Sequence, residues 1–297
     1  MTTAFSETVV QTYLDVPSQP KLVLPPNSCD SHVHVFGPRE RFPYAAARKN
    51  TPAEASKEKL FALHKKLGIA RCVIVQSITH GTDNSVVEDA IEASGGHYLG
   101  VALTDVDVSD TELKRLASRG FRAVRFNFMT HIGSGYDVID VIKLTPRLAE
   151  VGMHLQVHFE SQLVHTVGQE LLKSAVPVVI DHMGRVDATL GESHEDFQAL
   201  MKLLAHKHVR VKVSGIDRIE STARAGSGYP MGTQLAARLV GDFPDQCVWG
   251  LDWPHPNHTH IPDDGELVDA LSQIAPNKEL LEKLLVTNPH ALYRFPG

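Results

Sequence analysis

Short runs of apolar and β-branched residues recur along the chain, separated by longer stretches in which apolar residues return every three or four positions. The short runs are mostly apolar rather than cleanly alternating, as in strands that are covered on both faces. They predict eight strands, at residues 29–36, 72–76, 99–104, 123–128, 154–159, 177–183, 209–215 and 247–253.

The stretches between these runs have the periodicity of amphipathic helices. They lie at residues 57–68, 85–96, 111–120, 138–152, 161–174, 194–207, 231–244, 264–276 and 278–295. Eight strands that alternate with helices predict an α/β protein built as a (β/α)8 TIM barrel. The alternative is an open doubly wound sheet, which would need a glycine-rich phosphate loop after the first strand. Residues 36–44 (FGPRERFPY) do not supply one.

The first 27 residues are polar and rich in proline. This composition is typical of an extended segment rather than a packed element. We therefore expect an N-terminal arm over residues 1–27 and a single barrel domain over residues 28–297, because one such barrel commonly uses roughly 250 residues.

The charge balance and the cysteines limit the class of protein. There are 29 lysines and arginines against 35 aspartates and glutamates, a net charge of −6, so no broad basic surface for nucleic acid is expected. No run of about 18 apolar residues predicts a membrane span, and no basic start with an apolar stretch predicts a secretory signal. The three cysteines (Cys29, Cys72 and Cys247) lack CxxC spacing and favour a reducing compartment, so we expect a cytoplasmic protein.

Histidines gather at the predicted strand ends, where the chemistry of such barrels lies. His32 and His34 are two positions apart on the first strand and so point the same way. His158 is on the fifth strand, His182 on the sixth, and Asp252 ends the eighth. A lone strand histidine is more often a satisfied polar residue, but this set together fits a Zn²⁺ site with an open position. Asp252 is then the candidate general base for a water molecule.

Three arginines accompany these groups. Arg125 lies in the fourth strand, Arg185 follows the sixth and Arg218 follows the seventh. A guanidinium group presents paired donors that match carboxylate or sulfonate oxygens. The barrel mouth is therefore expected to be cationic, although the protein is net negative, and to favour a small anionic ligand.

Two residues after the second strand, Ser77 and His80, are further candidates for hydrogen bonds to ligand oxygens. His80 has an alternative role, which is to order its own loop through Asp83. Five further histidines in helix or loop contexts are interpreted as surface residues, namely His64, His206, His208, His258 and His260.

Several segments together resemble the amidohydrolase superfamily, and within it the branch of 2-pyrone-4,6-dicarboxylate lactonases and sulfomuconolactone hydrolases. They are CDSHVHVFGPRERFPY, VIVQSITHGTDN, FRAVRFNF, VVIDHMGR, WGLDWPHPN and LVTNPHALY. The resemblance implies a barrel that hydrolyses a lactone. It also implies that His32, His34 and His182 contact the region of the scissile carbonyl, that Asp252 activates water, and that Arg125 and Arg218 bind the substrate's carboxylates.

Three departures from the dicarboxylate lactonases bear on the substrate. The family has an arginine where this chain has His131, a tyrosine where it has His158, and another tyrosine near Asn50. These positions belong to substrate recognition in the family, and His158 would complete a metal-ligand set. We therefore expect a muconolactone from aromatic-compound breakdown that carries carboxylate or sulfonate groups.

Other reactions stay open at this point. They are hydrolysis of a pyrone dicarboxylate or a sugar-acid lactone, lactone isomerisation and metal-dependent decarboxylation. A non-catalytic binding protein is disfavoured, because the histidine and aspartate set is whole. Whether the protein is a monomer or a homo-oligomer also stays open.

Overall fold

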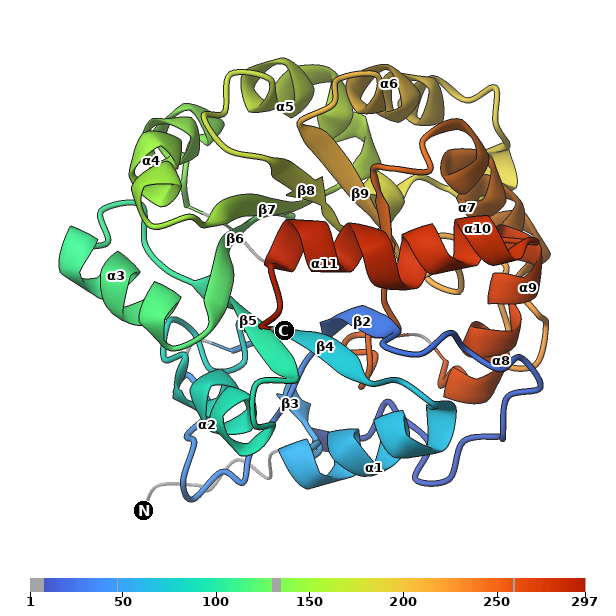
Figure 1. Ribbon diagram of the computed structural model, residues 1–297, viewed down its shortest axis with the longest axis horizontal. Coiled ribbons are helices and arrows are strands. Elements are labelled where there is room, and N and C mark those ends of the chain that lie inside the picture. Colours follow the sequence, from blue (N-terminus) through green and yellow to red (C-terminus); the bar gives the residue numbers. More distant parts are fainter. Residues whose placement is uncertain (1–7, 47, 130–134, 259, 297) are drawn as a thin grey trace.

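A computed structural model describes residues 8–46, 48–129, 135–258 and 260–296. Its centre is a parallel sheet of eight strands that follow one another in chain order around a nearly closed barrel (Figure 1). The strands are β2 (Cys29–Val33), β4 (Arg71–Val75), β5 (Tyr98–Leu103), β6 (Phe121–Phe128), β7 (His154–Phe159), β8 (Val178–Ile180), β9 (Val209–Val213) and β10 (Cys247–Trp249). The predicted (β/α)8 barrel is confirmed.

Helices surround the strands in Figure 1 and bury their apolar faces against the outside of the sheet. They are α1 (Lys57–Leu67), α2 (Ser85–Ala93), α3 (Asp110–Ser118), α4 (Val138–Glu150), α5 (Val164–Leu171), α6 (Glu195–Leu204), α7 (Pro230–Asp242), α8 (Asp264–Asp269), α9 (Leu271–Ile274), α10 (Lys278–Glu282) and α11 (Asn288–Tyr293). A π-helical turn, Lys283–Thr287, joins the last two, and 3₁₀ turns lie at Ser161–Leu163, Asp181–Arg185 and Ala188–Leu190. No helix in the described part of the chain has the length and apolar character needed to cross a membrane.

Several strands end earlier than the apolar pattern predicts, and the early ends of β8 and β10 lead into functional candidates. β8 ends at Ile180, because His182 and Met183 adopt left-handed backbone angles with φ of 49° and 52°. β10 ends at Trp249, and Asp252 also has a positive φ of 68°. Such angles are uncommon for residues other than glycine and break the extended chain. The tight turns aim the side chains of His182 and Asp252 differently from those of a continuing strand.

The seam between the first and last strands is closed by the residues that follow β10. The backbone amide of Asp252 donates to the carbonyl of His32 over 2.8 Å, and the amide of His34 donates to the carbonyl of Trp253 over 2.7 Å. Gly250 permits this approach, since a Cβ atom there would lie 2.6 Å from the backbone nitrogen of His32. The seam therefore fixes His32 and His34 relative to Asp252 through main-chain contacts.

A buried polar network supports the same seam. Asp30 Oδ1 accepts hydrogen bonds from the amides of His32 and Leu251. Its Oδ2 lies 3.4 Å from Nε2 of His64, whose Nδ1 contacts the hydroxyl of Tyr98 at 2.6 Å. The interpretation of His64 as a surface residue was wrong: its side chain is buried, because α1 turns this polar position inward onto Asp30.

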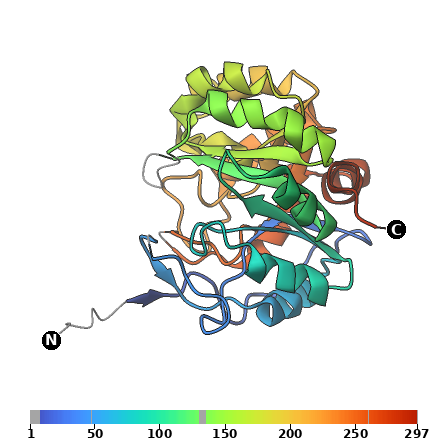
Figure 2. The same cartoon turned by 90° about the vertical axis from the view of Figure 1, so that its left-hand side faces the viewer.

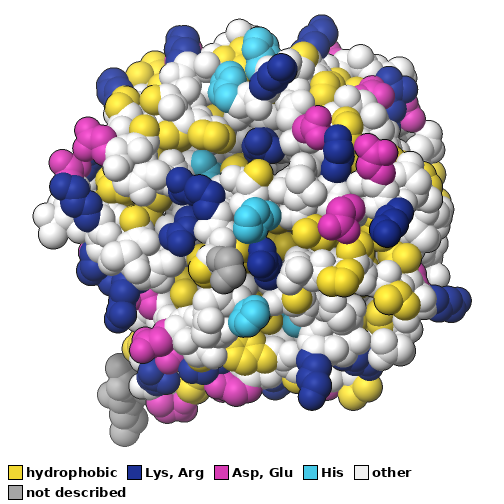
Figure 3. Space-filling view, viewed as in Figure 1, with side chains coloured by type: hydrophobic (Ala, Val, Ile, Leu, Met, Phe, Trp, Pro, Cys, Tyr) yellow, Lys and Arg dark blue, Asp and Glu magenta, His cyan; other side chains and the backbone are white. Residues whose placement is uncertain are grey.

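The C-terminal segment covers the end of the barrel at which the strands begin. Tyr293 packs on His154, the first residue of β7, with ring centroids 5.4 Å apart, and its carbonyl accepts a hydrogen bond from Arg122 Nε. α11 crosses this end of the barrel in Figure 1, and Figure 3 shows that acidic and basic side chains are interspersed on this face. The described residues of the C-terminal segment do not cover the opposite end of the barrel, where the strands finish and where the active site of such a barrel is expected.

The N-terminal segment lies against the barrel. Its β1 (Val9–Val10) pairs in parallel with β3 (Thr51–Pro52), forming a small second sheet that the sequence pattern did not predict. Tyr13 is buried and packs on Trp253, with ring centroids 5.4 Å apart. In Figure 2, β1 and the C-terminal helix lie on opposite sides of the molecule. The arm thus holds the β3 segment close to the strand ends.

Candidate active site

A cavity of about 540 Å³ lies at the carboxyl ends of the strands. It is lined by Val10, Thr12, His34, Arg48, Lys49, Asn50, Pro52, Ser77, Ile78, Thr79, Arg125, Met129, His158, His182, Arg185, Arg218, Asp252, Pro256, Asn257 and His258. Five of these side chains are cationic and one is a carboxylate, so the cavity suits an anionic ligand.

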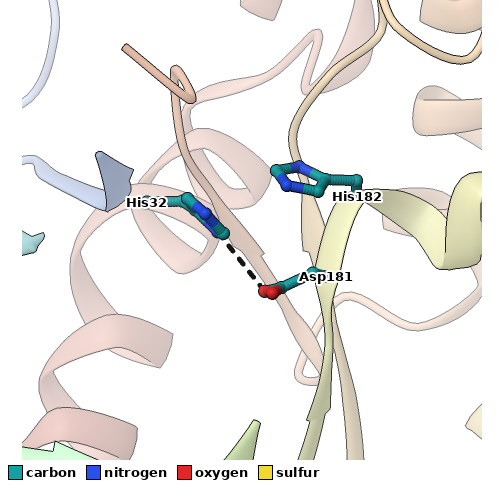
Figure 4. Close-up of side chains that lie close together, drawn as sticks. All are labelled: His32, Asp181 and His182. Atoms are coloured by element: carbon teal, nitrogen blue, oxygen red, sulfur yellow. Dashed lines mark ion pairs between the residues drawn. The ribbon is translucent and has the colours of Figure 1, made fainter. Parts of the chain in front are cut away.

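Three imidazoles converge on one carboxylate oxygen. Oδ1 of Asp252 lies 3.7 Å from Nε2 of His32, 3.5 Å from Nε2 of His34 and 3.7 Å from Nε2 of His182. The rings of His32 and His182 face each other with centroids 4.5 Å apart (Figure 4). Residues from β2, from the turn after β8 and from the loop after β10 thus meet at one point.

The second nitrogen of each ring holds that ring in place. His34 Nδ1 contacts the carbonyl of Val75 at 2.7 Å. Because a carbonyl only accepts hydrogen bonds, this nitrogen carries the proton and Nε2 keeps its lone pair. His182 Nδ1 pairs with the hydroxyl of Ser214 at 2.9 Å. The inward direction of the Nε2 atoms is therefore set by their surroundings.

Asp181, which the sequence analysis left without a role, anchors a buried ionic network below His32. Its Oδ2 accepts hydrogen bonds from Arg125 Nε at 2.7 Å and Gln156 Nε2 at 3.0 Å. Its Oδ1 lies 3.3 Å from His32 Nδ1, a contact drawn in Figure 4, and 3.7 Å from Lys212 Nζ. Burial would raise the pKa of Asp181, but the charge of Arg125, the contact with His32 and the charge of Lys212 outweigh it and hold this pKa well below its usual range.

Protonation states follow from burial and from Arg218. Burial alone would raise the pKa of Asp252, but the positive charge of Arg218 and the neighbouring imidazoles hold it well below its usual range. Burial lowers the pKa of His32 to about 3 and moves those of His158 and His182 well below their usual range. At neutral pH the site therefore combines the ionised carboxylate of Asp252 with the neutral imidazoles of His32, His158 and His182.

The three predicted arginines all line the cavity, but their guanidinium groups differ in the partners they have. Arg125 is tied to Asp181 through Nε, and Arg218 donates from Nη2 to Asp252 Oδ2 at 2.5 Å. Among the described residues, no hydrogen bond or ion pair engages the guanidinium of Arg185. Its pKa is lowered to about 10 by burial and by the charge of Arg218. Arg185 is thus the guanidinium most directly available to a ligand.

The other predicted site residues are more dispersed. His158 lies beside His182, with ring centroids 5.2 Å apart, and its Nδ1 contacts Asn127 Oδ1 at 3.2 Å. The candidate ligand clusters among the described residues do not include His158. Ser77 lines the cavity, and Asn50 also lines it while donating from Nδ2 to Asn257 Oδ1 at 2.6 Å.

The last two candidates from the sequence are His80 and His131. His80 is buried and is not among the residues that line the cavity, and its Nδ1 contacts the carbonyl of Pro43 at 3.1 Å. His131 lies outside the described residues.

The inner cluster fits a divalent metal ion. Two groups of potential ligands share His32. One is His32, His34 and Asp252, and the other is His32, Asp181 and His182; within each group the ligand atoms lie within 4.8 Å of one another. Within the described residues, the buried Nε2 of His32 has no hydrogen-bond partner. Neutral imidazoles with a carboxylate form a donor set that binds zinc and similar ions.

Sequence reasoning missed several residues of this site. Arg48 and Lys49 reach the cavity from the loop before β3, and Lys212 is fully buried beside His32. A signal existed for Lys212, because a lysine within the apolar strand VRVKV needs a buried partner. No such signal existed for Arg48 and Lys49, whose position depends on the pairing of β1 with β3.

Comparisons with known proteins bear on this arrangement. The family model described as Amidohydrolase matches residues 29–295. The chain is 42% identical over 284 residues to a 2-pyrone-4,6-dicarboxylate hydrolase of Comamonas testosteroni, and the match covers 93% of each chain. It is 37% identical over 277 residues to a 4-sulfomuconolactone hydrolase of Hydrogenophaga intermedia, covering 92% of this chain and 90% of the other.

Among solved structures, a probable 2-pyrone-4,6-dicarboxylic acid hydrolase of Acinetobacter baumannii with bound citric acid superposes with a TM-score of 0.79. Its sequence identity to this chain is 26%, and the superposition covers 91% of this chain and 100% of the other.

Proposed function

The chain belongs to the amidohydrolase family, and from this premise we propose that it opens the ring of a small anionic lactone by hydrolysis. The observation that carries the proposal is the convergence of His32, His34 and His182 on Asp252 at a cavity lined with cations. The names of the relatives, which are lactone hydrolases, support the same reaction class.

In the proposed mechanism, the arginines position the substrate. Arg185 binds an anionic group of the lactone, and Arg125 and Arg218 add positive charge on the same cavity wall. The ester carbonyl is placed next to the inner cluster, where a cation held by the imidazoles would stabilise the charge that develops on the carbonyl oxygen.

Asp252, kept ionised by Arg218, takes a proton from a water molecule that attacks the carbonyl carbon. The ring C–O bond then breaks. The proton passes from Asp252 to the departing oxygen, which leaves a hydroxy acid or its keto form.

We further propose that the inner cluster holds zinc. His32, His34, His182 and Asp252 are the residues that would hold the ion, with His158 as an additional candidate nearby. A bound zinc ion would polarise the ester carbonyl and lower the pKa of a bound water to about 7. Metal analysis of the purified protein tests this assignment, and chelation followed by readdition of Zn²⁺ tests whether activity depends on it.

For the substrate, we propose a muconolactone that carries a carboxylate and a sulfonate or second carboxylate. His158 and His131 stand where a dicarboxylate lactonase is expected to have tyrosine and arginine, which favours a different ring and substituent. A second candidate is 2-pyrone-4,6-dicarboxylate, favoured by the 42% identity to a hydrolase named for it.

The test is turnover of a lactone panel in [¹⁸O]water. A hydrolase incorporates ¹⁸O into the new carboxylate, whereas an isomerase leaves the product unlabelled and a decarboxylase releases CO₂. The panel includes a sulfomuconolactone, an unsulfonated muconolactone, 2-pyrone-4,6-dicarboxylate and a sugar-acid lactone. We expect labelled product and a loss of roughly 10³-fold in kcat for Asp252→Asn. Isomerised or decarboxylated product, or full activity in Asp252→Asn, contradicts the proposal.

We also propose a cytoplasmic location. Cys29, Cys72 and Cys247 are all buried free thiols, as suits a reducing compartment. Cell fractionation tests the location, and an oxidised periplasmic or extracellular pool of the protein contradicts it.

A further inference from the structure

A second cluster of potential ligands lies at the rim of the cavity. It is formed by Asp217, from the loop after β9, and by His258 and His260, from the loop after β10. One ligand atom from each lies within 4.8 Å of the others. The cluster shares no residue with the one around Asp252, and His258 also lines the cavity.

The burial of these groups corrects the sequence interpretation. His258 was interpreted as a surface residue, but its side chain is only 3% exposed and contacts the buried Asp217, with His258 Nε2 2.5 Å from Asp217 Oδ2. Ile216 and Ile219, which lie on either side of Asp217 in the chain, are also buried. A carboxylate removed from water in this way needs a cation or several hydrogen bonds to compensate it.

The two ring nitrogens of His260 differ in their surroundings. Its Nε2 faces the hydroxyl of Tyr229 at 3.2 Å, and its ring stacks on that of Tyr229 with centroids 5.7 Å apart. In the described part of the chain, its buried Nδ1 has no hydrogen-bond partner. A hydrogen bond on one ring nitrogen, which leaves the other nitrogen free to bind a metal ion, is the usual arrangement of ligating histidines.

We propose that Asp217, His258 and His260 form a second divalent-metal site of the zinc class, separate from the cluster around Asp252. Two imidazoles and one carboxylate are a ligand set that zinc binds while keeping a fourth position open. Because His258 lines the cavity, the open position lies at its rim. Ligand bonds of roughly 2.0–2.2 Å require the contact between Asp217 and His258 to widen by about 1 Å.

This proposal does not rest on the lactonase function, since it concerns binding alone. Purified protein is stripped with chelator, dialysed against Zn²⁺ and analysed for bound equivalents. The double variant Asp217→Asn/His260→Ala is expected to hold one equivalent fewer than the unaltered chain. The matched control His206→Ala, at an exposed histidine, is expected to hold the full number.

The variant His182→Asn separates the two sites. It disturbs only the inner cluster, so it is expected to keep the equivalent that depends on Asp217 and His260. Co²⁺ substitution provides a second readout, because visible d–d bands that persist in His182→Asn and disappear in the double variant report the rim site directly. If the double variant does not fold, His260→Gln replaces it, and a loss of at least tenfold in affinity for one equivalent is expected. Equal metal content and affinity in the rim variants and the unaltered chain overturn the proposal.

Discussion

Arg218 donates a hydrogen bond from Nη2 to Oδ2 of Asp252 over 2.5 Å, so the guanidinium holds the carboxylate that faces the imidazoles. The same Nη2 also donates to the carbonyl of Pro256 at 3.2 Å, which ties the arginine to the loop after β10. The family resemblance implied that Arg218 binds the substrate's carboxylates. Its geometry gives it a second role, because it keeps Asp252 ionised and limits the directions in which Oδ1 can point.

Replacing Arg218 with methionine is expected to lower kcat and to move the acid limb of the pH profile upward. Removing the positive charge raises the pKa of Asp252 toward and above its ordinary value, so the carboxylate is protonated at a higher pH. We expect kcat at neutral pH to fall roughly 10²-fold and the acid limb to rise by about 1–3 units. The measurement is kcat against pH, and an unmoved acid limb contradicts the role assigned to Arg218.

Arg185→Met is expected to act on substrate binding instead. Of the three predicted arginines, Arg185 is the one whose guanidinium forms no hydrogen bond or ion pair with the described residues. Its loss therefore removes a contact to the anionic group of the substrate without disturbing Asp252. We expect KM to rise by roughly 10–100-fold with little change in kcat or in the acid limb, since a charged hydrogen bond contributes about 1.5–3 kcal/mol. An uncharged lactone of the same ring is the control, and its KM should not respond. A fall in kcat with unchanged KM would contradict this assignment.

The fold was predictable because strands covered on both faces leave uninterrupted apolar runs, and each run located a strand of the barrel. The predicted strand ends were wrong where the backbone turns sharply at residues of the candidate active site. Residues 177–183 were expected to be one strand, but β8 stops at Ile180 and His182 turns into left-handed geometry. A backbone angle of this kind leaves no mark on the hydrophobic pattern.

The rule that barrel chemistry lies at strand ends was sufficient to bring His32, His34, His182 and Asp252 to one place. It was not sufficient to find their partners. The environments that hold the rings, such as the hydroxyl of Ser214 and the carbonyl of Val75, depend on neighbouring strands and not on local sequence. Helical periodicity likewise failed for His64, because it does not distinguish a polar residue facing solvent from one facing a buried carboxylate.

Lys212 is expected to stabilise the fold through Asp181. Its ammonium group is fully buried, donates to the carbonyl of Ser31 at 2.8 Å and lies 3.7 Å from Asp181 Oδ1. Lys212→Met leaves the buried carboxylate with one cation fewer, so the free energy of unfolding should fall by about 3 kcal/mol. Urea denaturation measures the change. The control is Lys173→Met at a surface pair with Glu170, where a change below about 0.5 kcal/mol is expected. Equal effects of the two substitutions would contradict the role given to Lys212.

The protein is expected to lose stability as the pH falls below 6.5, and His154 provides the clearest test. Burial, followed by the charges of Lys212, Arg294 and Arg210, lowers the pKa of His154 to about 3 from an ordinary value of 6.5. The folded chain therefore holds this imidazole neutral, while the unfolded chain binds a proton below pH 6.5. The stabilisation is complete above pH 6.5 and is lost as the pH falls toward 3, by about 3 kcal/mol at pH 4.5.

Unfolding free energies at pH 7 and pH 4.5 should differ less in His154→Gln than in the unaltered chain. His206→Gln at an exposed position controls for the loss of one histidine. The same pH dependence in His154→Gln and the unaltered chain would show that His154 does not contribute to acid sensitivity.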